Sequence, residues 1–117
     1  MMPDFSAYDI DCDNVLRCLF DLSELDIMVL KILGEGGEHR SKILAEELDR
    51  DQSTVYRSLE KLVSCGLVYK EKETIRKGGY YYLYSCRPLD KVREEAKECL
   101  ETWYSEMMSS IEDLEDI

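Results

Sequence analysis

The period of apolar and polar positions changes twice along the chain. Between residues 23 and 66 apolar residues recur every three or four positions, which predicts three short helices. Residues 67–74 and 80–85 are instead rich in β-formers and are separated by Ile75–Gly79, which predicts two strands of a hairpin. Pro88 then suits a first helical position, and nothing interrupts a helix as far as Asp116. The predicted order is three helices, a hairpin and one long helix.

Local residues suggest where the three short helices begin and end. Ser23 and Asp26 form a variant of a capping box at the start of the first helix, and Gly34–Gly37 end it. Ser41 and Asp51 are expected to cap the second and third helices, and Gly66 closes the third. The positions expected to face inward are Leu25, Met28, Val29, Ile32 and Leu33 in the first helix, Ile43, Leu44, Ala45 and Leu48 in the second, and Val55, Leu59, Leu62 and Val63 in the third.

The second and third helices, joined by Asp49 and Arg50, predict a helix-turn-helix, and the hairpin after them predicts a wing. The free face of the third helix carries side chains that suit DNA, because Gln and Arg pair with base edges while Ser, Thr and Tyr reach phosphates. Cations at the hairpin tip could reach the backbone or minor groove. The candidate DNA-contacting residues are Ser41, Gln52, Ser53, Thr54, Tyr56, Arg57 and Lys61 on the helices, and Arg76 and Lys77 at the tip.

The long C-terminal segment carries a seam typical of helix pairing. Its apolar positions step mostly by three and four, with one stutter, over about 40 Å of helix. We expect this seam to form a homodimer, although the helix could instead fold back on its own domain. Twofold symmetry would predict an inverted-repeat operator. The candidate interface residues are Leu89, Val92, Ala96, Cys99, Trp103, Met107, Ile111 and Leu114.

Net charge qualifies the DNA prediction without removing it. The chain carries −11, but residues 1–22 hold −4, residues 88–117 hold −7 and residues 23–87 sum to zero. Within residues 50–77 seven basic residues exceed four acidic ones by three. This modest patch allows DNA binding that weakens steeply with salt, and the acidic ends would discourage indiscriminate binding.

Composition favours one intracellular domain with an appendage. The 117 residues include no signal-like or membrane-spanning apolar run, so we expect a cytoplasmic protein with no membrane partner. The five cysteines are odd in number and lack a CxxC pair, which predicts reduced thiols and neither a disulfide framework nor a zinc site. The single histidine, His39, lies in a glycine-rich loop, and no phosphate-binding loop, GxSxG or HExxH motif is present. We therefore predict no catalytic residue, metal or cofactor.

Three segments carry a resemblance to a known family: LSELDIMVLKIL at 22–33, SKILAEEL at 41–48 and STVYRSLEKLVSCGLV at 53–68. The chain resembles prokaryotic winged-helix transcriptional regulators, most of all archaeal proteins with a TrmB-type DNA-binding domain, and more distantly the MarR and ArsR groups. The resemblance covers residues 22–86. It implies a dimeric repressor or activator whose third helix enters the major groove and whose wing touches flanking backbone.

Two features depart from the family pattern. Asp49 and Arg50 stand where the turn usually has a glycine and an apolar residue, and Asp adopts the required left-handed backbone less readily than Gly. The sugar-binding domain of full-length TrmB-type regulators has no counterpart in these residues, so no carbohydrate ligand is inherited and any effector is unknown.

The predicted fold is mainly α with a small β-hairpin wing, and it divides into three parts. Residues 1–22 form an acidic extension with a short helix from near Asp11 or Asp13, residues 23–87 the winged helix-turn-helix, and residues 88–117 the dimerisation helix. The predicted function is sequence-specific DNA binding by a homodimeric transcriptional regulator. The alternatives are a winged helix that binds protein, as in transcription machinery, and an adaptor whose C-terminal seam docks a different helical partner.

Overall fold

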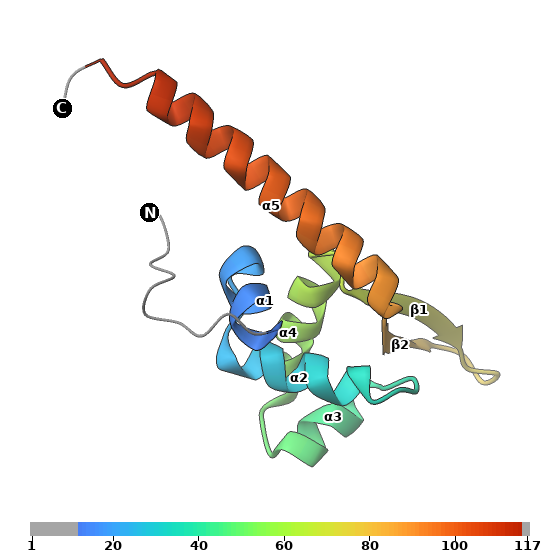
Figure 1. The fold of residues 1–117 in the computed structure, drawn as a ribbon. Helices are drawn as coiled ribbons and strands as arrows, with labels where there is room; N and C mark the ends of the chain where they lie inside the picture. Colours follow the sequence, from blue (N-terminus) through green and yellow to red (C-terminus); the bar gives the residue numbers. More distant parts are fainter. Residues whose placement is uncertain (1–11, 116–117) are drawn as a thin grey trace.

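A computed structural model describes residues 12–115 and contains five helices and one hairpin over that range. The elements are α1 (Cys12–Phe20), α2 (Glu24–Gly34), α3 (Ser41–Leu48), α4 (Gln52–Ser64), β1 (Val68–Thr74), β2 (Tyr80–Cys86) and α5 (Leu89–Glu112). Figure 1 shows α2, α3 and α4 gathered into a compact unit beside the hairpin, with α5 leaving it as a long straight arm. The predicted fold class, mainly α with a hairpin wing and a long C-terminal helix, is confirmed.

The core lies where α2, α3 and α4 meet the base of the hairpin. Its largest fully buried side chains are Val29, Leu33, Leu44, Val55, Leu59, Leu62, Leu67 and Tyr84. They come from all three helices and both sides of the hairpin, because each element contributes one apolar face to the same centre. Two predicted inward positions are wrong: Met28 is 39% exposed and Ile43 is 43% exposed. Ile27 and Leu30 are buried in α2 instead.

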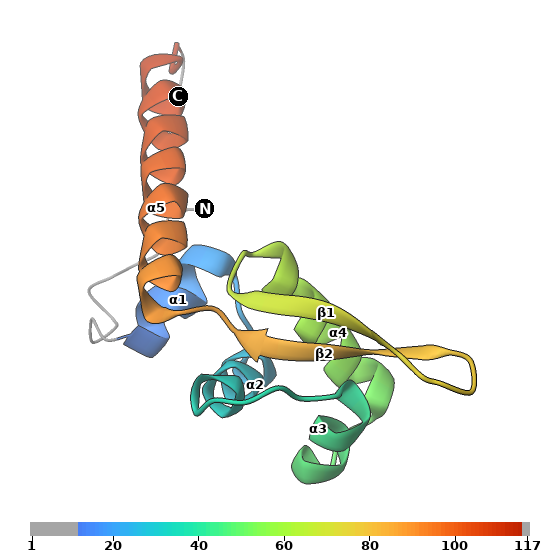
Figure 2. The same cartoon turned by 90° about the vertical axis from the view of Figure 1, so that its right-hand side faces the viewer.

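The hairpin is antiparallel, with Val68 opposite Cys86 and Thr74 opposite Tyr80. His39 forms an isolated antiparallel bridge with Tyr84 of β2. The His39 amide donates to the Tyr84 carbonyl (2.9 Å), and the His39 carbonyl accepts a hydrogen bond from the Tyr84 amide (2.8 Å). The loop before α3 is thereby fixed against the hairpin, as Figure 2 shows from the side. The glycine-rich sequence around His39 predicts a loop but gives no signal for this pairing.

The starts of the helices follow the sequence in part. The Ser23 hydroxyl accepts the Asp26 amide (3.1 Å) and the Asp26 carboxylate accepts the Ser23 amide (2.9 Å), which confirms the capping box. Asp49 has φ +52°, so it does supply the left-handed turn between α3 and α4. The predicted cap at Ser41 is wrong, because Arg40 holds the N-cap position and Ser41 is the first helical residue.

Helix α4 ends just before Gly66, where two backbone hydrogen bonds close its last turn. The Gly66 amide donates to the Val63 carbonyl (3.0 Å) and the Leu67 amide to the Leu62 carbonyl (3.1 Å), which is a Schellman motif. Gly66 has φ +80°, where a side chain is strained, and the Glu95 side chain lies against the position a Cβ would occupy. Leu67 then enters the core and starts the hairpin.

The long helix gives the molecule its elongated outline of 63 × 27 × 26 Å. Its first turns pack on α1 and its far end projects beyond the folded unit (Figure 1). The helix ends at Glu112, earlier than the predicted Asp116, so Leu114 lies beyond it and not on the seam. α1 agrees with the helix predicted from near Asp11 or Asp13, and residues 1–11 of the predicted N-terminal extension lie outside the described range.

Candidate nucleic-acid interface

Helix α4 separates a buried face from an exposed polar face. Val55, Ser58, Leu59 and Leu62 are buried, while Gln52, Ser53, Tyr56 and Arg57 are exposed and Thr54 is half-buried. This spacing is typical of an amphipathic helix that packs one face against the core. The structure therefore brings five of the candidate residues together on the outer side and edges of the first two turns of α4.

The start of α4 is organised by hydrogen bonds among its own polar side chains. Asp51 occupies the N-cap position, yet its carboxylate accepts a hydrogen bond from the Ser53 hydroxyl, and no capping bond from its side chain to the helix amides forms. That bond is the main reason why the pKa of Asp51 lies below its usual value. Arg57 Nη2 donates to Thr54 Oγ1 at 3.5 Å. Ser53, Thr54 and Arg57 are thus held in one polar group, with a carboxylate beside them.

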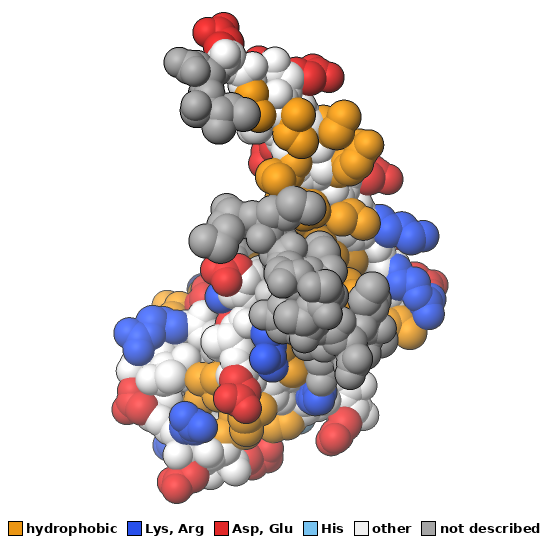
Figure 3. Space-filling model, turned by 60° about the vertical axis from the view of Figure 1, so that its left-hand side comes forward, with side chains coloured by type: hydrophobic (Ala, Val, Ile, Leu, Met, Phe, Trp, Pro, Cys, Tyr) orange, Lys and Arg blue, Asp and Glu red, His pale blue; other side chains and the backbone are white. Residues whose placement is uncertain are grey.

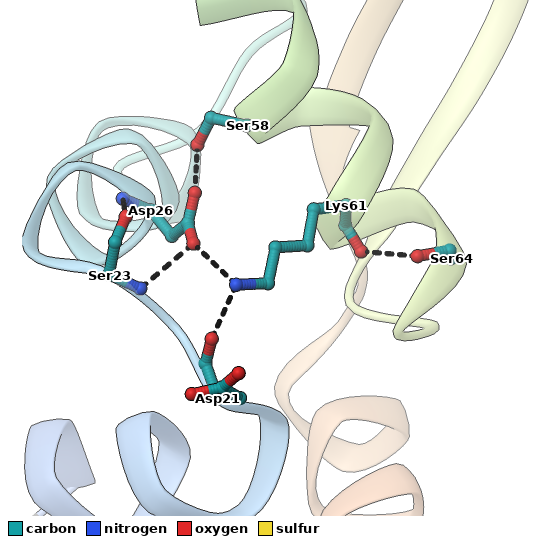
Figure 4. A network of polar contacts seen from close by, with 6 residues as sticks. All are labelled: Asp21, Ser23, Asp26, Ser58, Lys61 and Ser64. Atoms are coloured by element: carbon teal, nitrogen blue, oxygen red, sulfur yellow. Dashed lines mark hydrogen bonds and ion pairs between the residues drawn. The ribbon is translucent and has the colours of Figure 1, made fainter. Parts of the chain in front are cut away.

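Lys61 differs from the other candidate DNA-contacting residues because its ammonium is held by the protein itself. Its Nζ lies 3.2 Å from Asp26 Oδ2 and donates to the Asp21 carbonyl. Figure 4 shows the Lys61 side chain directed toward α2 and the segment before it. Lys61 therefore holds α4 against α2, and its ammonium is already engaged within the protein.

The partner of Lys61 is a buried carboxylate that sequence analysis treated only as a helix cap. Asp26 is 4% exposed and also accepts a hydrogen bond from Ser58, which is itself buried in α4 (Figure 4). Burial raises the pKa of Asp26, but hydrogen bonds from Ser58, Ser23 and Lys61 outweigh it and leave the pKa below its usual value. An ionised Asp26 thus links α2 to the inner side of α4.

Glu60 connects α4 to the hairpin. Its carboxylate accepts the Lys70 ammonium (2.8 Å) on one oxygen and the Tyr84 phenol (2.9 Å) on the other. The hydrogen bond to Glu60 raises the pKa of Lys70. The pKa of Tyr84 is raised mainly by burial and next by its hydrogen bond to Glu60. Glu60, one of the four acidic residues in 50–77, is therefore neutralised by Lys70 at short range.

The wing tip is a tight exposed turn that carries two cations. Gly78 donates to the Ile75 carbonyl (2.9 Å) and Ile75 to the Gly79 carbonyl (3.0 Å), and both glycines have positive φ. Arg76 and Lys77, between Ile75 and Gly78, are exposed. Figure 2 shows this tip projecting well away from the helices, so Arg76 and Lys77 do not join the residues of α4 in one cluster.

Lysines of β1 lie over tyrosine rings of β2, which were predicted only as β-forming residues. Lys72 lies over the Tyr80 ring and Lys70 over the Tyr82 ring, each with 4.2 Å between ammonium and ring centre. Arg40, just before α3, lies 4.1 Å over Tyr81. These contacts could have been predicted from the consecutive tyrosines of β2 and the lysines two positions apart in β1.

The predicted dimer residues differ in how far they are buried. Val92 is buried in the chain's own core, and the Cys99 thiol donates to the Leu19 carbonyl in α1 at 3.1 Å. Ala96, Trp103 and Met107 are half-buried. Leu89, Ile111 and Leu114 are exposed. The alternative that the helix packs on its own domain therefore holds for its first turns.

A second apolar stripe on α5 shares only Ile111 with the predicted seam. Leu100, Tyr104, Met108 and Ile111 step by four, four and three, and each is more than 40% exposed. Figure 3 shows apolar side chains gathered along the projecting part of this helix. A stripe of this size on an isolated arm is typical of a surface that another chain covers.

The described part of the chain offers no other obvious chemical centre. Residues 12–115 contain no group of three or more His, Cys, Asp or Glu side chains arranged to hold a metal ion. Burial raises the pKa of the Cys65, Cys86 and Cys99 thiols, which makes them poor nucleophiles. None of the helices in this range combines the length and the apolarity needed to cross a bilayer.

Comparison with known proteins agrees with this geometry. The family model described as sugar-specific transcriptional regulator TrmB matches residues 16–90, from α1 to the start of α5. The chain belongs to the TrmB family. A protein of Methanocaldococcus jannaschii described as uncharacterized is 32% identical over 103 residues, which cover 88% of this chain and 78% of that protein.

Solved structures place this TrmB-family chain among winged-helix transcriptional regulators. A possible transcriptional regulator from Methanosarcina mazei Go1 has the same fold, with a TM-score of 0.78, 23% identity and coverage of 99% of this chain and 98% of that one. The transcriptional regulator BldR from Sulfolobus solfataricus gives a TM-score of 0.51 at 30% identity and covers 89% and 71% of the two chains. Family and fold are thus those of transcriptional regulators and not of enzymes.

Proposed function

We propose that this chain is a sequence-specific DNA-binding transcriptional regulator that acts as a homodimer. Helix α4 would enter the major groove with Gln52, Ser53, Tyr56 and Arg57 toward the bases and phosphates, and the wing tip would contact the flanking backbone. The observation that carries the proposal is the exposed polar face of α4, flanked by the hairpin, in a chain of the TrmB family.

The dimer would form through the projecting part of α5. The helix has 24 residues, which corresponds to about 36 Å, and its exposed apolar stripe lies outside the folded unit. A symmetric pair of such arms would fix two copies of α4 at a set separation. Half-sites about 34 Å apart would make the operator an inverted repeat.

The direct test is a mobility-shift titration of the purified protein. One duplex is the region upstream of its own gene, the other is a random sequence of equal length, and each is titrated at two salt concentrations. We expect a selective shift that weakens with salt, and footprinting of the shifted duplex should show a two-part protected site. Equal or absent binding to both duplexes, even at low salt, would contradict the proposal.

A winged helix that binds protein is the second candidate, and the acidity of the chain favours it. The net charge is −11, with −7 in residues 88–117, which opposes any nearby phosphate. If the chain binds no duplex, affinity capture with the intact protein as bait should recover a subunit of the transcription machinery. Recovery of that partner would favour this candidate over DNA.

A further inference from the structure

A cleft separates the hairpin from the start of the helix-turn-helix. It has a volume of about 310 Å³ and lies between the first residues of α3, the first turns of α4 and strand β2. This volume is at the lower end of the range of about 300–1,000 Å³ for small-molecule sites. The cleft therefore has room for one small ligand or one unit of a polymer.

The lining of this cleft is positive although the chain is acidic. The lining includes Arg40 and Lys42, and no lining residue carries a carboxylate. The carboxylate of Glu60, which accepts the phenol of the lining residue Tyr84, is paired with Lys70. An anionic group would meet cations here without a competing acid in the wall.

Aromatic rings make up most of the remaining lining. Tyr80, Tyr81 and Tyr82 all line the cleft, and the rings of Tyr80 and Tyr82 meet edge to face with centres 5.5 Å apart. The Arg40 guanidinium lies 4.1 Å over the Tyr81 ring, which holds both planar groups in position. A flat ligand can stack against groups that are already ordered, at little cost in side-chain entropy.

We propose that this cleft binds one nucleotide with an unstacked base. Its phosphate would lie at Arg40 and Lys42, and its base would stack against Tyr81 and the neighbouring rings. Cations that follow phosphates, together with aromatic side chains that stack on bases, are the two components of single-strand and nucleotide recognition. A base inside a duplex is already stacked, so this contact differs from the major-groove contact of α4. The nucleotide is either free or part of a single strand.

A ligand in the cleft would also affect the contact with duplex DNA, a consequence that rests on the proposed function. Gln52 and Tyr56 line the cleft and also belong to the face of α4 proposed to contact duplex DNA. A nucleotide in the cleft would therefore compete with the duplex. The chain would release its operator when a free nucleotide or single strand is abundant.

The test is an amide chemical-shift titration of the intact ¹⁵N-labelled protein with three probes. AMP represents a free nucleotide, an oligothymidine of about eight nucleotides represents a strand, and inorganic phosphate represents the anion alone. We expect AMP or the oligonucleotide to shift the amides of residues 40–42 and 80–82. Shifts with AMP identify a free nucleotide as ligand, and shifts with the oligonucleotide alone identify a strand.

Four variants separate the roles of ring and charge. Tyr81→Ala should weaken nucleotide binding at least about fivefold, because removing one stacking ring costs roughly 1–3 kcal/mol. Tyr81→Phe keeps the ring and should bind like the wild type. Arg40→Gln should also weaken binding, whereas Arg93→Gln removes an exposed cation from α5 and should not. Thermal melting of each variant confirms that it is folded.

Three outcomes overturn the proposal. The first is the absence of shifts at residues 40–42 and 80–82 with AMP and the oligonucleotide. The second is equal binding by Tyr81→Ala and the wild type. The third is equal shifts with phosphate alone, which would leave a simple anion site. Duplex binding is measured separately by mobility shift. A chain that binds duplex but no nucleotide would overturn only the proposed nucleotide site. A chain that binds nucleotide but no duplex would overturn only the proposed function as a DNA-binding regulator.

Discussion

The phenol of Tyr84 donates a 2.9 Å hydrogen bond to Glu60 and so joins the hairpin to helix α4. Tyr84 is 1% exposed, and its backbone also pairs with His39 ahead of α3. One residue of β2 thus contacts helix α4 and the loop that leads into α3. The angle between the wing and α4, on which simultaneous contact with groove and backbone depends, is set in part by this residue.

Tyr84→Phe tests that connection. The variant keeps the ring in the core and removes only the phenol, so the free energy of unfolding should fall by about 0.5–1.5 kcal/mol in urea titrations. Tyr69→Phe, at an exposed phenol on β1, is the control and should change stability little. A Tyr84→Phe protein as stable as the wild type would mean that Lys70 alone satisfies Glu60.

Removing the buried carboxylate of Asp26 should be more costly. Asp26→Ala breaks the Ser58 bond, the ion pair with Lys61 and half of the capping box at once. We expect a loss of about 2–4 kcal/mol in denaturant titrations near neutral pH. Asp90→Ala removes an exposed carboxylate from the first turn of α5 and should cost under about 1 kcal/mol. Similar losses in the two variants would contradict a special role for Asp26.

The same carboxylate gives a pH dependence of known sign. The pKa of Asp26 is lowered in the folded protein, so its stabilisation is fully present above the unfolded value of about 3.9 and is lost as pH falls through the folded pKa. Melting temperatures from pH 7 down to pH 2 should therefore show the wild type and Asp26→Asn converging below about pH 4. A constant difference across that range would show that Asp26 does not titrate in this way.

Gly66→Ala should destabilise the junction of α4 and β1. A methyl group there would sit 2.7 Å from the Glu95 carboxyl carbon and at φ +80°, so we expect a loss of about 1–3 kcal/mol. Gly34→Ala is the matched control, because nothing lies within 4 Å of its Cβ position and it is helical. The control should be neutral or slightly more stable in thermal melts. Glu95→Ala combined with Gly66→Ala should recover only the part due to the contact.

Base reading and backbone contact should separate in DNA titrations. If α4 reads bases, Arg57→Ala should weaken binding to the specific duplex by about 1–3 kcal/mol with little effect on random DNA. Lys77→Ala should weaken all duplexes alike and reduce the salt slope by about 1. Mobility shifts at several salt concentrations measure both. Equal loss on specific and random DNA for Arg57→Ala would remove its assignment as a base reader.

Dimerisation through α5 can be tested at its exposed stripe. A charge at Ile111 would be buried in a paired arm, so Ile111→Glu should shift the mass measured by light scattering from twice 13.7 kDa to 13.7 kDa. Ser109→Glu adds the same charge at an exposed position on the opposite side of the helix and should leave the dimer intact. A wild-type protein that is already monomeric would contradict the homodimer and favour a different helical partner for α5.

The local sequence was sufficient for the elements and most of their ends. The capping box at Ser23, the turn at Asp49 and the hairpin around Ile75–Gly79 depend on residues within a few positions of one another, so periodicity and turn chemistry could predict them. Ser41 failed as a cap because a serine before an apolar run fits equally well one residue inside the helix.

Side-chain partners distant in sequence could not be predicted in this way. Lys61 and Arg57 are both cations on one helix, yet only Lys61 faces the buried Asp26, which is 35 residues earlier in the chain. The polar face of α4 and the family were evident from the residues themselves. Packing decided which of those residues remain free for a ligand. It also decided that Lys70 neutralises Glu60 and that Arg40 and three tyrosines line one cleft. Charge and burial depend on neighbours that only the folded chain brings together.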